Sequence, residues 1–205
     1  MKIENILFDF DGVIMDSMPV RDKGFKLIFK NYPAELVQAL ISYNNLNGGL
    51  SRYVKIRYFF EELLCEPISE EAVMILAAQF SDAMRTELLN PTLLIKDTVA
   101  FIEANYTRFN MHVVSGSDQN ELQFICSELG LKKYFKSVHG SPTPKDTLIA
   151  ELMNNYKYDN LETVLIGDSI NDYAAAENNS IVFFGYNNAA LNNCRYIHSF
   201  QDIHF

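Results

Sequence analysis

The segment ILFDFDG at residues 6–12 joins a short apolar run to two aspartates and a glycine. Consecutive apolar residues bounded by turn residues are typical of a buried strand. Asp9 and Asp11 follow it two positions apart, so their side chains can point the same way. Gly12 permits the tight turn that comes next. Because neighbouring carboxylates repel unless a cation or a shared proton accompanies them, the segment predicts a functional site at a strand end.

Apolar runs and helical patterns alternate through the C-terminal half of the chain. Near-continuous apolar strands that alternate with helices predict an α/β fold, with a parallel sheet covered by helices on both faces in a Rossmann-like three-layer core. The predicted strands are Ile3–Phe8, Met111–Val114, Ser137–Val138, Thr163–Ile166 and Ile181–Phe184. The predicted helices are Lys96–Asn105, Asp118–Leu129, Pro144–Asn155 and Ile170–Glu177.

A different pattern fills the region between the first strand and the rest of the core. It shows helical periodicity and no convincing strand, and NNLNGG at residues 44–49 is expected to break a helix. Ser51 and Ser69 are expected to cap helices over Tyr53–Leu64 and Glu70–Leu88. We therefore predict an inserted all-helical cap at residues 17–90, with residues 1–16 and 91–205 forming the catalytic core.

Composition narrows the class of protein. The 205 residues carry a net charge of −9, which disfavours nucleic-acid binding. Between Ser17 and Phe60, however, the sequence contains seven basic and two acidic residues. The local charge is therefore 7 − 2 = +5, which suits a small anionic ligand. No apolar run is long enough to cross a bilayer, and no secretory signal precedes the first strand, so a cytoplasmic protein without membrane contact is expected. A monomer or weak dimer is expected.

Two further strands are predicted to end in polar residues. One runs into Ser115-Gly116, and another runs into Gly167-Asp168. The carboxyl ends of parallel strands share one edge of a sheet, where ligands bind, so Asp9, Ser115 and Asp168 should lie close together. An oxygen-rich site of this kind favours Mg²⁺.

These residues carry a family resemblance that extends over nearly the whole chain. DFDGV at residues 9–13 resembles the first motif of the haloacid dehalogenase superfamily, and Ser115 resembles the second. Lys145 is the best match to the third motif, and GDSIND at residues 167–172 matches the fourth. Taken together and in order, the motifs resemble the phosphatase-like branch with a small helical cap, which includes phosphoglycolate phosphatase and β-phosphoglucomutase-like proteins.

The resemblance implies a phosphoric monoester hydrolase acting on a small phosphorylated metabolite, a sugar phosphate or a phospho-acid. Asp9 would attack phosphorus and form an aspartyl-phosphate. Asp11 would protonate the leaving alcohol and then deprotonate the attacking water. Mg²⁺ would be held by the carboxylates of Asp9 and Asp168 and by the backbone carbonyl of Asp11.

The same resemblance assigns the remaining residues of the site. Ser115, Gly116 and Lys145 would bind the transferring phosphoryl group, which is mainly electrostatic work. Asp172 would support the metal site or Lys145. Lys133 and Lys136 also precede the third motif region, so Lys145 is chosen by its register.

Two cap arginines are candidates for substrate contact. Arg52 follows a Gly-Gly loop that resembles the substrate loop of capped members, and it would suit a second anionic group. Arg21 lies near a position where many mutases and some hydrolases have a His. The cap aromatics and His112 are expected to be structural, and Asp118 is expected to cap a helix.

Two alternatives stay open at this point, and a third is not supported by the sequence. A sugar phosphomutase needs the same two aspartates, although Arg21 in place of a His weakens this hypothesis. A non-catalytic phosphometabolite-binding module would more naturally lack Asp9 or Asp11, and both are present. A phosphonate hydrolase would need a Schiff-base lysine in the cap, and nothing in the sequence marks one among Lys23, Lys26 and Lys55.

Overall fold

A six-stranded parallel sheet organises the computed structural model, which describes residues 2–203 and 205. The strands lie in the order β3-β2-β1-β4-β5-β6, which places the first strand at the centre. They are β1 (Asn5–Phe8), β2 (Asn110–Asp118), β3 (Ser137–Ser141), β4 (Thr163–Gly167), β5 (Val182–Tyr186) and β6 (Tyr196–Ile197). The predicted α/β class is confirmed, and the two-residue strand β6 is an addition that its length hid from pattern analysis.

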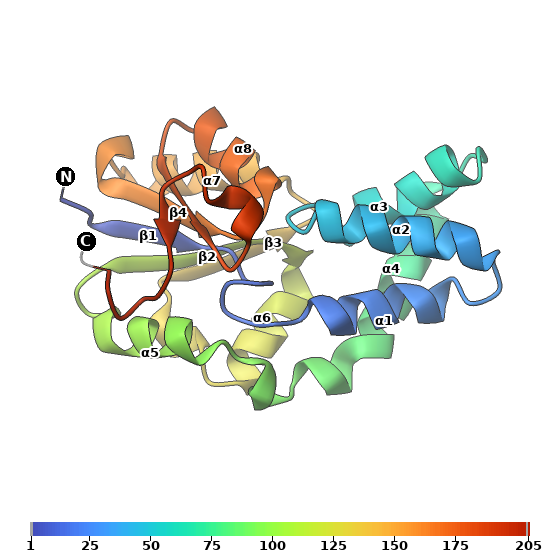
Figure 1. Cartoon of the computed structure of the whole chain (residues 1–205), viewed down its shortest axis with the longest axis horizontal. Coiled ribbons are helices and arrows are strands. Elements are labelled where there is room, and N and C mark those ends of the chain that lie inside the picture. The colour runs from blue at the N-terminus through green and yellow to red at the C-terminus, as the bar shows by residue number, and fades with distance from the viewer. Residues whose placement is uncertain (1, 204) are drawn as a thin grey trace.

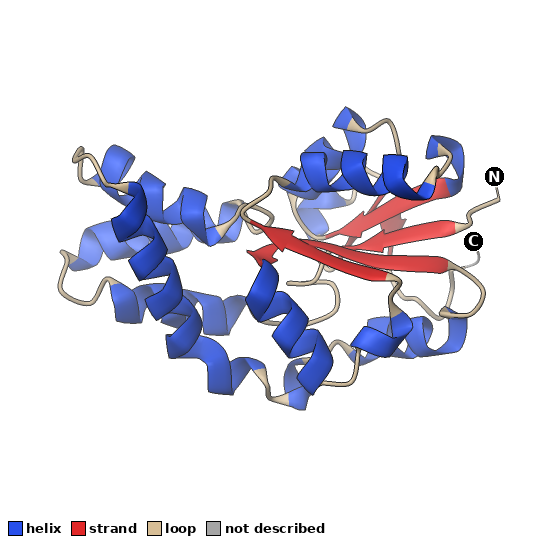
Figure 2. Ribbon diagram, turned by 180° about the vertical axis from the view of Figure 1, so that it is seen from behind, coloured by secondary structure: helices blue, strands red, loops and turns tan. Residues whose placement is uncertain are grey.

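Helices cover both faces of the sheet. The pairs α5 (Lys96–Asn105) with α6 (Gln119–Glu128) and α7 (Lys145–Tyr156) with α8 (Ile170–Asn178) lie on opposite faces (Figures 1 and 2). Side chains alternate along β1, so Ile6 and Phe8 join one buried cluster and Leu7 joins the other. This explains why β1 is apolar throughout: it is buried on both faces.

The inserted segment forms a helical body beyond the carboxyl ends of the strands (Figure 1). Its elements are α1 (Met18–Ile28), α2 (Ala34–Leu46), α3 (Arg52–Tyr58), a π-helical turn (Phe59–Leu63) and α4 (Glu70–Leu88). Ser51 and Ser69 cap α3 and α4 as predicted, each accepting a backbone N–H hydrogen bond. The predicted aromatic core is present, with Phe59 fully buried.

The cap shows one predicted helix break and one departure from the prediction. Helix α2 ends at Leu46, inside the segment 44–49 that was expected to break a helix, and Asn44 in its last turn is buried with its amide donating to Asp22 Oδ1 over 2.8 Å. The helix after Ser51 changes to π geometry at Phe59 instead of continuing regularly. Periodicity alone does not separate these two helical geometries.

The two connections between core and insert run side by side. Asp16 N donates to Leu93 O over 2.8 Å, and Ile95 N donates to Ile14 O over 2.9 Å. The division of the chain into residues 1–16 with 91–205 and residues 17–90 stays a prediction. Short 3₁₀ turns occur at Pro91–Leu93, Lys132–Tyr134, Asn160–Glu162 and Ala189–Leu191. Among the described residues, no helix has the length and hydropathy that crossing a bilayer requires.

Candidate active site

Strand register brings the predicted site residues to one edge of the sheet. Phe8 of β1 lies opposite Val113 of β2 and Ile166 of β4. Asp9 therefore leaves the sheet between the polar ends of the two neighbouring strands, and its N–H still donates to Ile166 O over 2.9 Å. The structure thus gathers Asp9, Ser115 and Asp168 as the topology predicted.

Three carboxylates meet at this edge. Oxygen atoms of Asp9, Asp168 and Asp172 all lie within 4.8 Å of one another. Asp172 is fully buried because it belongs to the capping box of α8, where Oδ2 accepts from Ser169 N over 3.0 Å. Lys145, at the start of α7, places Nζ 2.8 Å from Asp9 Oδ1 and also contacts Asp172. One ammonium therefore faces three carboxylates.

This excess of negative charge disturbs the titration of the cluster. Burial, followed by repulsion from Asp172, raises the pKa of Asp9 despite the opposing effect of Lys145. Burial and the charge of Asp9 raise the pKa of Asp168 in the same way. Both carboxyls are short of positive charge, which a cation would provide.

The donor set fits magnesium. Carboxylate oxygens are hard ligands of the kind that Mg²⁺ prefers, and they converge in a buried position at the end of the sheet. One residue is added to the carboxylates that were predicted to hold the metal: Asp172, expected only to support the site, lies within the cluster with Asp9 and Asp168. The predicted contribution of the Asp11 backbone carbonyl stays a prediction.

Gly12 makes room for this cluster. Its φ of +79° lies in the left-handed region, and a Cβ built there would lie 1.9 Å from Asp168 Oδ2. Any larger residue would therefore strain the turn and displace a carboxylate of the cluster.

The Asp11 carboxylate is held by its own set of hydrogen-bond donors, separate from the carboxylate cluster. Its Oδ2 accepts from Ser117 Oγ over 2.5 Å, and its Oδ1 accepts from Ser17 Oγ and from Arg21. The Arg21 Nη2 atom lies 3.1 Å from that oxygen. Burial would raise the pKa of Asp11, but Arg21 and the two hydroxyls outweigh it and lower the pKa below its usual range. Asp11 is thus held as a carboxylate.

The loop after β2 meets the cap. Ser115 is buried, and its Oγ accepts from Ser117 N over 3.1 Å, which orients the hydroxyl. A Cβ at Gly116 would lie 2.4 Å from Gly49 O of the cap loop. Gly49 N in turn donates to Ser169 Oγ over 3.3 Å. The cap loop therefore lies directly against the core on both sides of the site.

Both cap arginines point into the site and already form ion pairs with carboxylates of the protein. Arg21 and Arg52 are buried, and each forms an ion pair with Glu121 on α6, the Arg52 Nη2 atom at 2.5 Å from Glu121 Oε1. Burial would raise the pKa of Glu121, but the two guanidinium groups more than offset it and lower the pKa to about 2. Sequence reasoning missed Glu121, because an acid at the third position of a helix that Asp118 caps is typical of an ordinary helix start.

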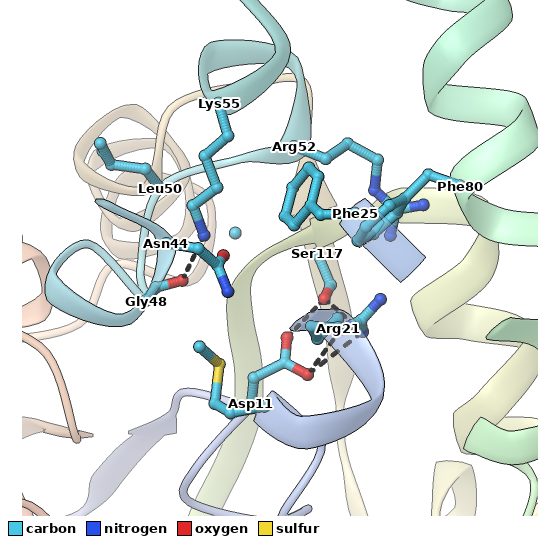
Figure 3. A pocket seen from close by; sticks show the side chains of 12 residues that line it. Asp11, Arg21, Phe25, Asn44, Gly48, Leu50, Arg52, Lys55, Phe80 and Ser117 are labelled. Atoms are coloured by element: carbon cyan, nitrogen blue, oxygen red, sulfur yellow. Dashed lines mark hydrogen bonds and ion pairs between the residues drawn. The ribbon is translucent and has the colours of Figure 1, made fainter. Parts of the chain in front are cut away.

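These arginines and Asp11 line a small cavity (Figure 3). Its volume is about 30 Å³, and its walls include Phe25, Leu50 and Phe80. Lys55 of α3 reaches into it from the cap and donates to Gly48 O over 3.3 Å. The sequence placed Lys55 only among several cap lysines, because its burial depends on the packing of α3 against the core.

Two residues that we expected to be structural are structural. Asp118 caps α6, with Oδ1 accepting from the backbone N–H groups of Asn120 and Glu121. His112 is buried in β2, where its ring nitrogens lie 2.6 Å from Ser137 Oγ and 3.0 Å from Tyr158 OH.

Sequence comparison places the chain in a family. Residues 6–186 match the family described as haloacid dehalogenase-like hydrolase, so the chain belongs to it. The chain is 25% identical over 195 residues to a phosphoglycolate phosphatase of Vibrio parahaemolyticus, covering 89% of this chain and 83% of that protein. It is 28% identical over 156 residues to a fructose-1-phosphate phosphatase of Escherichia coli, covering 72% of this chain and 78% of that protein. The predicted class of phosphoric monoester hydrolase is confirmed.

Solved structures share the fold. A β-phosphoglucomutase from Clostridium difficile superposes with a TM-score of 0.79 at 14% identity, over 99% of this chain and 94% of that one. CbbY from Rhodobacter sphaeroides, solved with phosphate, superposes with a TM-score of 0.75 at 16% identity, over 98% of this chain and 96% of that one. At these identities the likeness concerns the fold.

Proposed function

We propose that this protein is a magnesium-dependent phosphatase that hydrolyses a small phosphorylated metabolite through a phosphoryl group carried on Asp9. The observation that supports this most strongly is the buried Asp9 carboxylate at the central strand end, within the three-carboxylate cluster and 2.8 Å from Lys145 Nζ. The two phosphatases similar to this chain point to the same class of substrate.

Each residue of the carboxylate cluster has a proposed role. Asp9, Asp168 and Asp172, together with the backbone carbonyl of Asp11, would hold Mg²⁺. When bound, the cation would neutralise the cluster and polarise the phosphoryl oxygens. Lys145 already compensates part of the charge of Asp9 and Asp172, so it favours the ionised form of Asp9 that attack on phosphorus requires.

The phosphoryl oxygens would be bound by Ser115, by the backbone N–H of Gly116 and by Lys145. Ser115 and Gly116 follow β2 at the same sheet edge as Asp9, and Lys145 touches Asp9 directly. Fixed donors around a buried centre stabilise charge on the transferring group without reorganising during the reaction.

Asp11 would act as the general acid and the general base of the reaction. As a carboxylate, which its hydrogen bonds favour, it can deprotonate the water that hydrolyses phosphoryl-Asp9. The earlier step needs its protonated form for the leaving alcohol. Release of Arg21 from Asp11 would raise the pKa of that carboxyl and allow it to take up the proton.

Phosphate release from a panel of phosphorylated metabolites and a generic aryl phosphate tests the proposal. Each would be assayed with Mg²⁺, with a chelator and with the variant Asp9→Asn. Release that needs both Mg²⁺ and Asp9 is expected. A folded protein that releases no phosphate from any ester would contradict the proposal, and sugar phosphates with a bisphosphate activator would then test for a mutase.

The predicted cytoplasmic location and the predicted monomer or weak dimer stay predictions, as does the absence of nucleic-acid partners.

A further inference from the structure

The structure assigns to Lys55 the recognition of a single carboxylate at the far end of the substrate. We therefore infer that the preferred substrate is a short phosphate monoester that carries a carboxylic acid. This inference rests on the proposed phosphatase function and adds the substrate class and the residue that selects it.

Lys55 differs from the other buried cations of the site. Its residue is only 5% exposed, and its ammonium hydrogen-bonds a neutral acceptor, the carbonyl oxygen of Gly48. Arg21, Arg52 and Lys145 each form an ion pair with a carboxylate, whereas no carboxylate in residues 2–203 or 205 forms one with Lys55. A buried cation without a counter-ion is costly, and here burial lowers the pKa of Lys55 to about 7.

The cavity beside Lys55 has one positive charge in excess when Lys55 is protonated. The two arginines that line it are balanced by Asp11 and Glu121, so their sum is 2 − 2 = 0. Lys55 adds one further positive charge when it is protonated, and a single monovalent anion bound beside it would neutralise that charge and favour the protonated form. Arg21 and Arg52, predicted as substrate ligands, are less available because binding to them requires breaking an existing ion pair.

The shape of the cavity favours a small anion. It measures about 30 Å³, and its other walls include the apolar side chains of Met18, Phe25, Leu50 and Phe80. Two further polar wall residues are already engaged, since the Asn44 amide donates to Asp22 and the Ser117 hydroxyl donates to Asp11. Asp11 and Gly116 also line it, so one short molecule could lie between the reacting centre and Lys55 (Figure 3).

A matched pair of substrates tests the inference. 2-Phosphoglycolate is the shortest stable phosphate monoester with a carboxylate, and 2-hydroxyethyl phosphate has the same chain length with a neutral hydroxyl. We expect wild-type protein to prefer the acid in kcat/KM. In Lys55→Met the preference should fall by about 10- to 100-fold, mainly through KM, because a hydrogen bond between charged groups contributes on the order of 1.5–3 kcal/mol.

The control is Lys23→Met, which removes an exposed lysine of α1 that pairs with Glu87 and should leave the preference unchanged. Thermal unfolding supplies a readout independent of turnover. Lys55→Met should unfold at a temperature equal to or above that of wild type, because it removes a buried uncompensated charge, whereas a packing role would lower it. Lys55→Gln gives the same comparison if the Met variant fails to fold.

The outcomes distinguish failure of the Lys55 role from failure of the phosphatase function. Wild-type protein that hydrolyses the aryl phosphate but prefers 2-hydroxyethyl phosphate or fructose 1-phosphate would overturn the role of Lys55 and leave the phosphatase intact. An unchanged preference in both Lys55 variants would overturn it as well. Absence of Mg²⁺-dependent release from every ester would instead contradict the proposed function itself.

Discussion

Asp9 and Asp11 are two positions apart and have opposite electrostatic surroundings. Asp9 lies among other carboxylates, which together with burial raise its pKa, while Arg21 and two hydroxyls lower that of Asp11. Pairs of carboxyls whose pKa values are driven apart by their environments are typical of sites where they have different tasks. Here the separation depends on Ser117 and Arg21, which contact Asp11 and leave Asp9 to Lys145.

Substitution of Gly12 should damage the cluster more than the fold. In Gly12→Ala, the new Cβ would collide with Asp168, so we expect phosphatase activity to fall by at least about tenfold together with a loss of stability of about 1–3 kcal/mol. Gly130→Ala is the matched control, because Gly130 has a similar φ of +70° and a Cβ there meets no atom within 4 Å. Equal activity losses in the two variants, measured beside urea unfolding, would contradict the account.

The elements around the site are joined by Glu121. This single carboxylate on α6 of the core binds arginines from α1 and from α3, so it ties two cap helices to the core. Tyr53 of α3 adds a second link, donating to Asp118 Oδ2 over 2.6 Å at the other end of the same turn. The start of α6 therefore makes polar contacts with both α1 and α3 of the cap.

Removal of the Glu121 charge should be destabilising and pH-dependent. Glu121→Gln leaves the buried Arg52 without its counter-ion and leaves Arg21 paired with Asp11 alone, which costs about 3 kcal/mol. Because the folded-state pKa is lowered to about 2, this stabilisation is complete above the ordinary value of 4.5 and is lost as the pH falls toward 2. Urea unfolding of both proteins should show a difference that is constant near neutrality and shrinks in acid.

Glu87→Gln is the control for that experiment, since Glu87 pairs with Lys23 at the surface and should contribute at most about 1 kcal/mol. A wild-type advantage over Glu121→Gln that persists undiminished at pH 2 would contradict the assigned role.

The sequence predicted most of these elements because their patterns are local. The alternation of apolar runs with helical patterns located five strands and four core helices, and serine caps marked the starts of α3 and α4. The shared edge of Asp9, Ser115 and Asp168 followed from topology. The roles of Glu121 and Lys55 could not be predicted from the sequence because they depend on tertiary contacts. In the sequence, Glu121 resembles an ordinary acidic residue at a helix start. Lys55 resembles the other cap lysines, and only the packing of α3 against the core buries it.

At the scale of the whole molecule, an acidic cluster in the core lies beneath basic side chains of the cap. The carboxylates of Asp9, Asp168 and Asp172 gather at the sheet edge, whereas the cap brings Arg21, Arg52 and Lys55 over it. Asp11 and Glu121 pair with the two arginines, so within a protein of net charge −9 the carboxylate cluster suits a metal ion and Lys55 suits an anionic ligand.

Magnesium should consequently stabilise the whole fold. At a free Mg²⁺ concentration about a hundred times its Kd, mass action predicts about 3 kcal/mol of added stability against unfolding, and a chelator should remove it. Asp168→Asn should lose most of this increment because it deletes one carboxylate of the cluster. Urea unfolding with and without Mg²⁺ measures both, and an identical increment in the variant would contradict the proposed site.

The most direct test of the central claim, attack by Asp9, is a burst experiment with Asp11→Asn and an aryl phosphate. A good leaving group needs no proton from residue 11, while hydrolysis of the intermediate needs Asp11 as base. We predict release of one equivalent of phenol per protein, with a phosphoryl group found on Asp9 after acid quench and peptide mapping, and no burst in Asp9→Asn. Steady turnover without a burst, a burst that survives loss of Asp9, or a phosphoryl group on another residue would contradict it.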